Sequence, residues 1–345
     1  MTTTPPRTLP ASWYTSGPLY QLEKRAVFLK AWYLLGPIVK FPPGSTTAYE
    51  FAGVHLTVSR PSSSTASTLE IRTSPDGQAL RHHTTPTGLV FTTISPLAPP
   101  FSEYFPGLED TLATVDFTAR PHRRSLQYPG RFNWKTMVDG YQECLHCAYT
   151  HPAFSLRYPP TSYAVLNHHN WCRHLADPAQ TTDGLFLYFF PNCTLNVYGG
   201  GMTSFRVCPS AEPGETRMEF DYYHVAEGKE FEEYFAFVRQ VAMEDFELCE
   251  TAQENLERGI YAEGVLNPMK ENGVAYYQQR VLELVLEQHQ QDRAERNQHS
   301  TTTTSTTETC TAMRQVPKAS RSDPSPERGR TGSEYRIGEI VSAAA

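Results

Sequence analysis

The spacing of apolar and polar residues predicts a mixture of helices and strands in the first third of the chain. Apolar positions at helical spacing predict a helix over residues 19–35. Apolar and polar residues alternate over residues 48–58, which predicts two strands joined at Gly53. A short apolar run predicts a further strand over residues 88–94. Proline and turn residues separate these elements, so residues 1–110 are expected to be rich in strands and turns.

The middle of the chain, residues 111–290, combines strands with long helices. The predicted helices cover residues 132–149, 230–259 and 274–290. The predicted strands cover residues 184–199, with a turn inside that range, 202–208 and 218–224. Strands followed by long helices indicate an α+β fold in which an antiparallel sheet packs against helices.

The composition changes after residue 290. The sequence STTTTSTTET is followed by a mixture of proline, serine and arginine, and few aliphatic residues remain. A segment with so little apolar surface to bury does not offset the entropy lost on folding. Residues 291–345 are therefore expected to form a disordered, low-complexity tail.

Composition and charge narrow the class of protein. The content of 39% hydrophobic and 12% aromatic residues supports a sizeable core. A formal net charge of −7 without a basic run argues against nucleic acid as the main partner. The N-terminus has no signal-peptide pattern, and no apolar run reaches the roughly 18 residues needed to span a membrane. Seven cysteines without a disulfide framework predict free thiols and a reducing, cytoplasmic location.

The segment NWKTMVDGYQECLHCAYTHP, residues 133–152, contains the strongest candidate chemistry. Glu143 precedes His146 by three residues, and His151 follows five residues later. Two histidines and a carboxylate are typical ligands of a non-haem iron site that leaves positions open for dioxygen. Residues five apart lie about 140° apart around a regular helix. The two histidines therefore converge only if the helix ends between them, and Pro152 favours such an ending.

A third ligand is expected from the long helix over residues 230–259. Asp245 completes its apolar stripe, whereas Glu244 and Glu247 fall on other faces. A carboxylate on a buried stripe is costly unless it is paired or binds a metal. The alternative is that Asp245 belongs to a solvated acidic run, and that the histidines are hydrogen-bonded core residues.

Two further features of residues 133–152 have alternative explanations. Cys144 and Cys147 form a CxxC pair that could bind zinc or exchange disulfides. No second CxxC follows, so packing against the helix is the favoured role. Asn133 would support the site from behind or cap the helix that follows it.

The same residues resemble the catalytic domain of Rieske non-haem iron oxygenase alpha subunits, in the choline-monooxygenase-like and carnitine-oxygenase-like branch. The match covers roughly residues 9–285 and includes LPASWYTS, LEKRAVFLKAW, YEFAGV, APPFSEYFPGLED, YFFPNCTLNVYGGG and MEDFELCETAQ. The resemblance implies a helix-grip catalytic domain over residues 111–290 and a homo-oligomer, a trimer in the family. It also implies Fe(II) held by His146, His151 and Asp245, with Glu143 as the bridge for electrons from a neighbouring subunit.

The chain departs from this family in its N-terminal part. The family holds a [2Fe–2S] cluster with CxH and CxxH motifs, but residues 1–143 contain no cysteine. His82 and His83 have no thiolate partners and are expected to be exposed loop residues. No [2Fe–2S] cluster is therefore expected in this chain, and residues 1–110 are interpreted as a truncated remnant of a β-rich Rieske domain.

Three explanations of the missing motif stay open. A separate Rieske or reductase partner would supply electrons, or the iron would do chemistry that needs no external reductant, or an exon is missing from the gene prediction. The first predicts an oxygenase that hydroxylates a small substrate with O₂, either a choline-like quaternary amine or a secondary metabolite. The alternative function is a catalytically impaired binding or assembly subunit. Candidates for aromatic surface that would bind a cationic substrate are Tyr188, Phe189, Phe190 and Tyr198, although most of such a stripe ordinarily belongs to the core.

Overall fold

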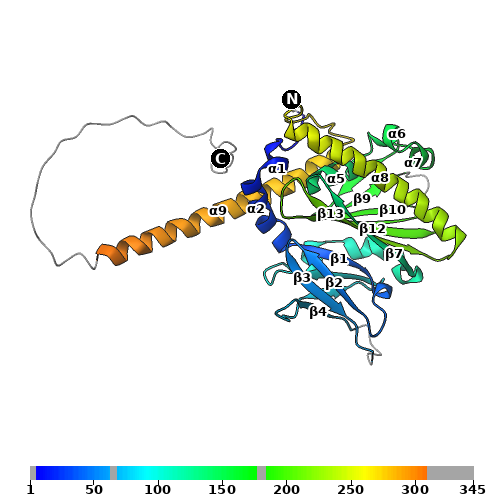
Figure 1. Cartoon of the computed structure of the whole chain (residues 1–345), viewed down its shortest axis with the longest axis horizontal. Coiled ribbons are helices and arrows are strands. Elements are labelled where there is room, and N and C mark those ends of the chain that lie inside the picture. The colour runs from blue at the N-terminus through cyan, green and yellow to red at the C-terminus, as the bar shows by residue number, and fades with distance from the viewer. Residues whose placement is uncertain (1–4, 63–67, 177–183, 309–345) are drawn as a thin grey trace, which may run out of the picture.

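A large antiparallel sheet forms the centre of the chain (Figure 1). The computed structural model describes residues 5–62, 68–176 and 184–308, without the side chains of residues 299–308. Within these residues the sheet has seven strands in the order β7-β13-β12-β11-β10-β9-β8. The strands are β7 (His122–Gly130), β8 (Ala164–Asn167), β9 (Trp171–Leu175), β10 (Leu185–Phe189), β11 (Cys193–Tyr198), β12 (Gly201–Pro209) and β13 (Thr216–His224).

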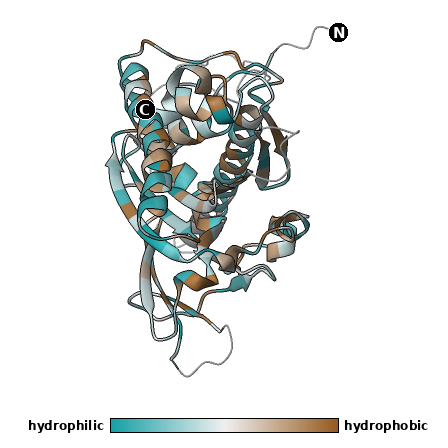
Figure 2. Cartoon of the chain, turned by 90° about the vertical axis from the view of Figure 1, so that its right-hand side faces the viewer, coloured by the Kyte–Doolittle hydropathy of each residue, from teal (hydrophilic) through white to brown (hydrophobic). Residues whose placement is uncertain are grey.

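Two long helices accompany this sheet. Helix α8 (Lys229–Glu257) lies across the sheet, as Figure 1 shows, and Phe235 packs edge-on against Tyr222 of β13 at 4.9 Å between ring centres. Helix α9 (Asn272–Glu308) packs against α2 and β8, and its second half extends away from the rest of the chain. Apolar and polar positions are interleaved along the helices and strands in Figure 2, as expected of amphipathic elements with one buried face. The α+β prediction is confirmed.

The N-terminal part contains two smaller antiparallel sheets of three strands each, β1-β6-β5 and β2-β3-β4, within the residues described. Their strands are β1 (Trp32–Pro37), β2 (Thr46–Phe51), β3 (Val54–Ser59), β4 (Glu70–Thr73), β5 (His82–Thr84) and β6 (Leu89–Thr93). The strand pair predicted around Gly53 and the strand predicted over residues 88–94 are both present. Gly53 turns between β2 and β3 with φ 88°, a value that glycine adopts without steric cost.

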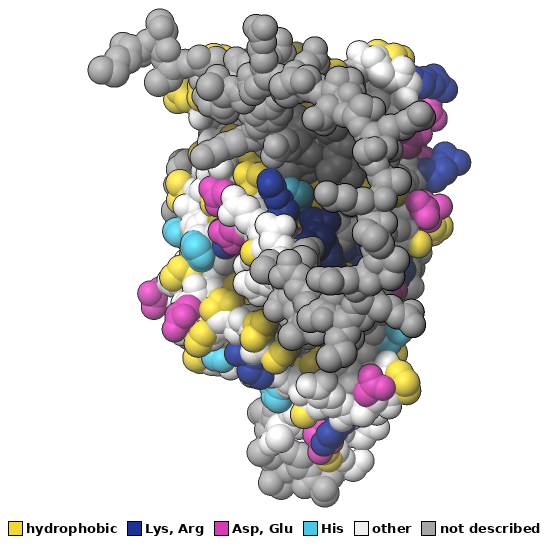
Figure 3. Space-filling view, turned by 90° about the vertical axis from the view of Figure 1, so that its left-hand side faces the viewer, with side chains coloured by type: hydrophobic (Ala, Val, Ile, Leu, Met, Phe, Trp, Pro, Cys, Tyr) yellow, Lys and Arg dark blue, Asp and Glu magenta, His cyan; other side chains and the backbone are white. Residues whose placement is uncertain are grey.

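The remaining helices are short. They are α1 (Ser12–Thr15), α2 (Gly17–Ala26), α3 (Phe101–Tyr104), α4 (Leu108–Leu112), α5 (Trp134–Tyr141), α6 (Cys147–Thr150) and α7 (Pro152–Arg157), with 3₁₀ turns at Phe28–Lys30, Ile38–Lys40 and Phe117–Ala119. None of the described helices is both long and apolar enough to cross a bilayer. On the face seen in Figure 3, acidic and basic side chains are interspersed over the part that is visible.

Two predicted helices are shorter than expected. The helix predicted over residues 19–35 ends at Ala26, and Trp32–Pro37 form strand β1 instead. Every residue of β1 is buried, and a fully buried strand shows no alternation that would separate it from a helix. The helix predicted over residues 132–149 ends at Tyr141, and a new helix, α6, begins at Cys147.

Two other predictions are wrong in part. Residues 291–308 continue α9, so they are not disordered, whereas residues 309–345 lie outside the described part of the chain. His82 and His83 lie in strand β5 rather than in a loop. The His83 ring stacks on Phe101 at 4.1 Å between ring centres, and its Nε2 lies 2.8 Å from Glu109 Oε1.

A buried ion pair fixes the start of α5, the helix that leads into the candidate site. Lys135 Nζ lies 2.8 Å from Glu23 Oε2, and both side chains are fully buried. The indole nitrogen of Trp134 donates a second hydrogen bond to Glu23. Asn133 caps the helix, because its side-chain oxygen accepts a hydrogen bond from the Lys135 backbone nitrogen at 3.1 Å. Of the two roles weighed for Asn133, the structure therefore bears out the cap.

Candidate metal centre

The chain between α5 and α7 brings His146 and His151 together. Helix α5 ends at Tyr141, the following loop carries Glu143, and His146 stands at the start of α6. His151 follows α6 with φ −120° and precedes Pro152, which begins α7. A residue before proline is disfavoured in a helix, so the break falls at His151 itself. The two histidines therefore face each other from a loop and a helix junction, which one regular helix would not allow.

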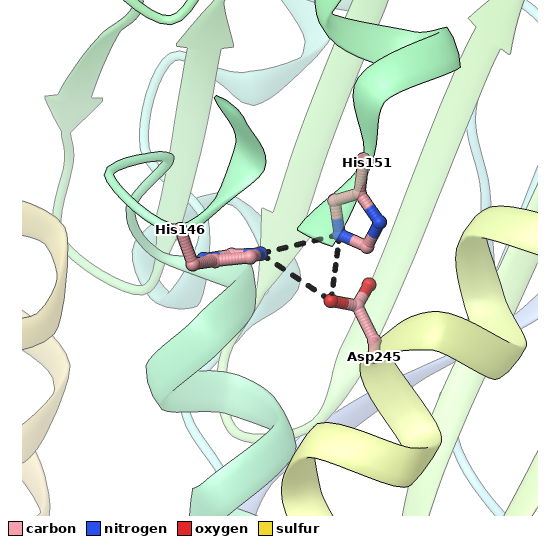
Figure 4. Close-up of side chains that lie close together, drawn as sticks. All are labelled: His146, His151 and Asp245. Carbon is pink, nitrogen blue, oxygen red and sulfur yellow. Dashed lines mark hydrogen bonds and ion pairs between the residues drawn. The ribbon is translucent and has the colours of Figure 1, made fainter. Parts of the chain in front are cut away.

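Asp245 meets the two histidines from α8 (Figure 4). Its Oδ1 lies 2.9 Å from His151 Nε2 and 3.3 Å from His146 Nε2, and the two Nε2 atoms are 3.2 Å apart. Two imidazole nitrogens and one carboxylate oxygen thus converge on one point. The structure brings together all three residues that the sequence suggested as metal ligands.

Each imidazole also contacts a carboxylate through its Nδ1 atom, on the side of the ring away from the convergence point. Glu143 Oε1 is hydrogen-bonded to His146 Nδ1, and Glu244 Oε2 lies 2.8 Å from His151 Nδ1. A carboxylate that accepts the Nδ1–H leaves the Nε2 lone pair facing the convergence point. The same pairing orients and strengthens metal-binding histidines in proteins. From the sequence, Glu244 falls on another face of α8 than Asp245, and the structure brings His151 Nδ1 to that face.

The ionisation of the three residues reflects this convergence. Burial alone would lower the pKa of His146, but its hydrogen bonds to Asp245 and Glu143 outweigh burial and raise the pKa to about 10. Burial also opposes the raised pKa of His151, and the Asp245 hydrogen bond again prevails. Both imidazoles lower the pKa of Asp245 against the effect of burial. Without a metal ion, protons therefore bridge the same three atoms that a divalent cation would bind.

The donor set fits an octahedral metal ion. Nitrogen and oxygen ligands at about 2.1 Å, set at right angles on one face of an octahedron, lie about 3.0 Å apart. The three observed separations run from 2.9 to 3.3 Å. Two histidines and one carboxylate on one face, with the opposite positions open, is the ligand pattern of non-haem Fe(II) oxygenases. Together with the two backing carboxylates, this arrangement suits a divalent cation.

Cys144 and Cys147 are joined by a disulfide bond, contrary to the free thiols expected from the sequence. The helix break between α5 and α6 places their Cα atoms 5.0 Å apart, within the range of disulfides. In this state neither sulfur offers a thiolate to a metal. Cys172, Cys193, Cys208 and Cys249 are buried and not disulfide-bonded.

The candidate centre lies between two cavities. The first, called the helix-side cavity, has a volume of about 360 Å³ and is lined by α1, α5 and α8, including Tyr14, Asp139 and Cys249. The second, called the sheet-side cavity, has a volume of about 100 Å³ and is lined by the large sheet together with α5, α7 and α8. Glu143, His146 and Asp245 border both cavities, whereas His151 borders only the sheet-side cavity. The centre is therefore reachable from two sides.

The aromatic wall of the sheet-side cavity differs from the one predicted. Of the four aromatic residues expected from the sequence, only Tyr198 lines the cavity. Tyr188, Phe189 and Phe190 are buried in the core. The aromatic lining residues that sequence reasoning missed are Tyr141, Phe154, Tyr163, Phe186, Phe205 and Phe220. They come from six different elements or loops, so only the tertiary fold brings them together.

A buried carboxylate, Asp139, stands at the helix-side cavity. It accepts hydrogen bonds from the hydroxyls of Tyr14, at 2.7 Å, and Tyr277, and from Gln278 Nε2 at 2.6 Å. Burial raises the pKa of Asp139 from its ordinary value of 3.8 to about 6, although these hydrogen bonds favour the charged form. The network ties α1, α5 and α9 together behind the candidate centre.

The raised pKa of Asp139 predicts a specific dependence of stability on pH. Between about pH 4 and pH 6 the folded protein holds a proton that the unfolded chain has released, so stability falls as pH rises. The Asp139→Asn variant lacks this group. Urea unfolding of both metal-free proteins should show wild type losing on the order of 2 kcal/mol relative to the variant from pH 4 to pH 7. Parallel pH profiles of the two proteins would show that Asp139 keeps an ordinary pKa.

The fold and the convergent donor atoms define the chain as an α+β protein with a facial two-histidine, one-carboxylate centre. Residues 117–287 match the family described as the ring hydroxylating alpha subunit (catalytic domain). This part of the chain belongs to that family. The expected family resemblance is thereby confirmed.

Individual relatives point to the same branch. The chain is 29% identical over 219 residues to the carnitine monooxygenase oxygenase subunit of Escherichia coli K12, a match that covers 55% of this chain and 57% of that protein. It is 24% identical over 165 residues to the chloroplastic choline monooxygenase of Spinacia oleracea, across 44% of this chain and 37% of that protein. The chain thus spans little more than half the length of the carnitine monooxygenase subunit that it matches.

A solved structure shows the same fold. The quaternary ammonium Rieske monooxygenase CntA, in complex with its substrate L-carnitine, superposes with a TM-score of 0.70 at 20% sequence identity. The superposition covers 81% of this chain and 95% of that one. At this level of identity the likeness concerns the fold.

Proposed function

We propose that this chain is a non-haem Fe(II) oxygenase in which His146, His151 and Asp245 hold the iron. The observation that carries the proposal is the convergence of three ligand atoms within 3.3 Å of one another, each imidazole backed by its own carboxylate. A buried cluster of this kind is stable when a cation satisfies it. When bound, ferrous iron would supply the activation of dioxygen at the open positions of the site.

The reaction we propose is hydroxylation of a C–H bond. One substrate R–H, one O₂, two electrons and two protons give R–OH and one water. The protein's own residues hold the reactants: Asp245 and the histidines fix the centre, and the sheet-side cavity receives the substrate beside it. The substrate class we propose is small quaternary amines, because aromatic walls and nearby carboxylates favour a cation and two relatives act on such compounds by name. A secondary metabolite of similar charge fits the same argument.

Electrons would enter through Glu143. This carboxylate is hydrogen-bonded to His146 and also borders the helix-side cavity, on the side away from the substrate. It therefore connects a ligand of the proposed iron to the larger of the two cavities. Since residues 1–143 contain no cysteine to hold a [2Fe–2S] cluster, the proposed donor is a separate Rieske or reductase partner.

The domain organisation follows the same proposal. The two small sheets within residues 1–110 would be the remnant of a Rieske domain, and residues 111–290 the catalytic domain. Assembly as a homo-oligomer, by resemblance a trimer, would place a neighbouring chain beside Glu143.

A catalytically impaired binding or assembly subunit is the second candidate. The observation that favours it is the lack of any cysteine before Cys144, which removes the family's own source of electrons. It predicts that the sheet-side cavity binds a small molecule without converting it.

Hydrogen peroxide separates the two candidates, because it supplies both the oxygen atom and the oxidising equivalents. The balance is R–H plus H₂O₂ giving R–OH plus water, with no partner protein. The chain loaded anaerobically with Fe(II) should convert a quaternary amine such as choline and incorporate ¹⁸O from labelled peroxide, whereas the zinc-loaded chain should not. Absence of labelled product from choline, carnitine and γ-butyrobetaine, in protein that holds iron, would favour the impaired subunit.

A further inference from the structure

The sheet-side cavity has an aromatic wall that faces the candidate metal centre. Phe186 of β10 and Tyr198 of β11 lie 5.4 Å apart between ring centres, and Phe205 and Phe220 lie 5.7 Å apart. All four residues line the cavity. The faces of aromatic rings attract cations, most strongly where water is excluded. This wall therefore suits an alkylammonium group.

The acidic groups around the cavity outnumber its imidazoles by three to two. Glu143 and Asp245 border it, and Glu244 lies directly behind His151. No lysine or arginine borders the cavity among the residues that the structure describes, and the undescribed residues 177–183 contain neither in their sequence. A divalent cation at the centre would not reverse the sign, because three carboxylates surround it. A carboxylate on a ligand would enter this cavity against an excess of carboxylates and without a lysine or arginine to balance it, which is costly.

Arg157 does not change this balance. Its guanidinium lies 4.8 Å from the ring centre of Phe237 and lines a separate cavity of about 180 Å³ on the far side of Tyr198. Glu230 and Glu233 border that neighbouring cavity as well. The guanidinium is therefore already surrounded by acidic groups and an aromatic face outside the sheet-side cavity.

Away from the candidate metal centre, the polar groups that line the cavity are neutral. The Tyr141 hydroxyl donates to Asn196 Oδ1 at 2.6 Å, which leaves the amide Nδ2 as a donor for a ligand. The Tyr163 hydroxyl lies 2.6 Å from His174 Nδ1, and burial lowers the pKa of His174 to about 3, so this imidazole is neutral. Neutral donors and acceptors suit a hydroxyl, ester or amide group.

The size of the cavity limits the ligand further. Its volume of about 100 Å³ is well below the roughly 300–1,000 Å³ of cavities that hold drug-sized ligands. A trimethylammonium group with a short neutral arm suits this space better than a longer chain with a charged end.

We propose that the sheet-side cavity selects small ammonium compounds whose other end is a neutral hydroxyl, ester or amide group, and excludes those that carry a carboxylate. This inference rests on the proposed function and names the substrate class of the same site. It sets the chain apart from relatives that take a betaine such as L-carnitine, since the same metal chemistry would act on a different set of amines.

Four ligands test the inference by isothermal titration calorimetry on the full chain, both metal-free and loaded with Fe(II) without oxygen. Glycine betaine and its methyl ester share a skeleton and differ in the negative charge. Choline and 3,3-dimethylbutan-1-ol share a shape and differ in the positive charge. The ester should bind at least about tenfold more tightly than glycine betaine, and choline at least about tenfold more tightly than the uncharged alcohol.

Three results would overturn the inference. Equal affinities for glycine betaine and its ester would show that the cavity accepts a carboxylate, and equal affinities for choline and the alcohol would show that charge is irrelevant. Failure of all four ligands to bind would overturn it too. Iron incorporation is measured separately, so each of these failures is distinct from failure of the proposed iron site.

A pair of variants on strand β10 links the selectivity to the aromatic wall. Phe186→Leu removes a ring that lines the cavity and should weaken choline binding about tenfold, with little effect on 3,3-dimethylbutan-1-ol. Phe189→Leu, on the same strand but packed in the core against Phe91 and Phe105, should change neither affinity. Equal loss in both variants would show that the effect comes from loosening of the core.

Discussion

The Asp245→Ala variant is expected to lose iron binding and oxygenase activity together. Among the residues that the structure describes, Asp245 supplies the only carboxylate oxygen that lies within 3.3 Å of both imidazole Nε2 atoms. Without it, two imidazoles facing each other at 3.2 Å would have to hold a divalent cation alone. The affinity for Fe(II) should fall by at least about 100-fold, since removal of even an outer partner of a metal ligand costs 10–100-fold. Iron content after anaerobic loading and desalting measures this loss.

A matched control stands two residues further along α8. Glu247 is exposed and makes no contact with the centre, so Glu247→Ala removes the same kind of charge without touching the site. This variant should hold as much iron as wild type. Equal loss of iron in both variants would mean that a diffuse acidic surface collects iron. Full retention in both would show that Asp245 is not a ligand.

The Glu143→Gln variant is expected to separate electron delivery from the chemistry at the iron. Its amide oxygen still accepts the Nδ1–H of His146, so the imidazole keeps its orientation and iron affinity should fall by no more than about tenfold. The negative charge at the helix-side cavity is lost. Turnover driven by an electron-donating partner should therefore fall by about 100-fold or more, whereas peroxide-driven turnover should stay within a few-fold of wild type.

Glu244→Gln is the control for this experiment. Glu244 contacts Nδ1 of His151 as Glu143 contacts Nδ1 of His146, but Glu244 does not border the helix-side cavity. The substitution should lower iron affinity to a similar extent and reduce both kinds of turnover in proportion. If Glu143→Gln also reduced the two in proportion, Glu143 would be a positioning residue only.

The sequence was sufficient to predict which three side chains converge, but not the carboxylates that support them. The spacing of His146 and His151, with Pro152 after them, indicated a helix break between them. The structure has that break at His151, in addition to an earlier break between Tyr141 and Cys147. The sequence indicated Asp245 as the third candidate because it is a carboxylate at a position on the apolar stripe of its helix. Glu244 was missed, because a stripe on one helix does not show which outside segment wraps around its edge.

The errors in the fold have a common physical origin. The apolar run that ends in β1 is buried on every side, and periodicity cannot separate a helix from a strand there. Of the four aromatic candidates from the sequence, Tyr198 lines the cavity and residues 188–190 do not, because neighbours along the chain need not be neighbours in space. Antiparallel pairing instead brings Phe186, Phe205 and Phe220 together from three strands. The Cys144–Cys147 disulfide was missed because its geometry depends on the end of α5.

X-ray absorption spectroscopy of the anaerobic Fe(II)-loaded chain shows directly whether His146, His151 and Asp245 hold the iron. We expect one iron per chain in a shell of nitrogen and oxygen ligands at about 2.0–2.2 Å, with imidazole scattering from two histidines. Sulfur ligands at about 2.3 Å would place the metal on Cys144 and Cys147 instead. A chain that retains no iron, or iron held by sulfur, would contradict the proposed centre of His146, His151 and Asp245.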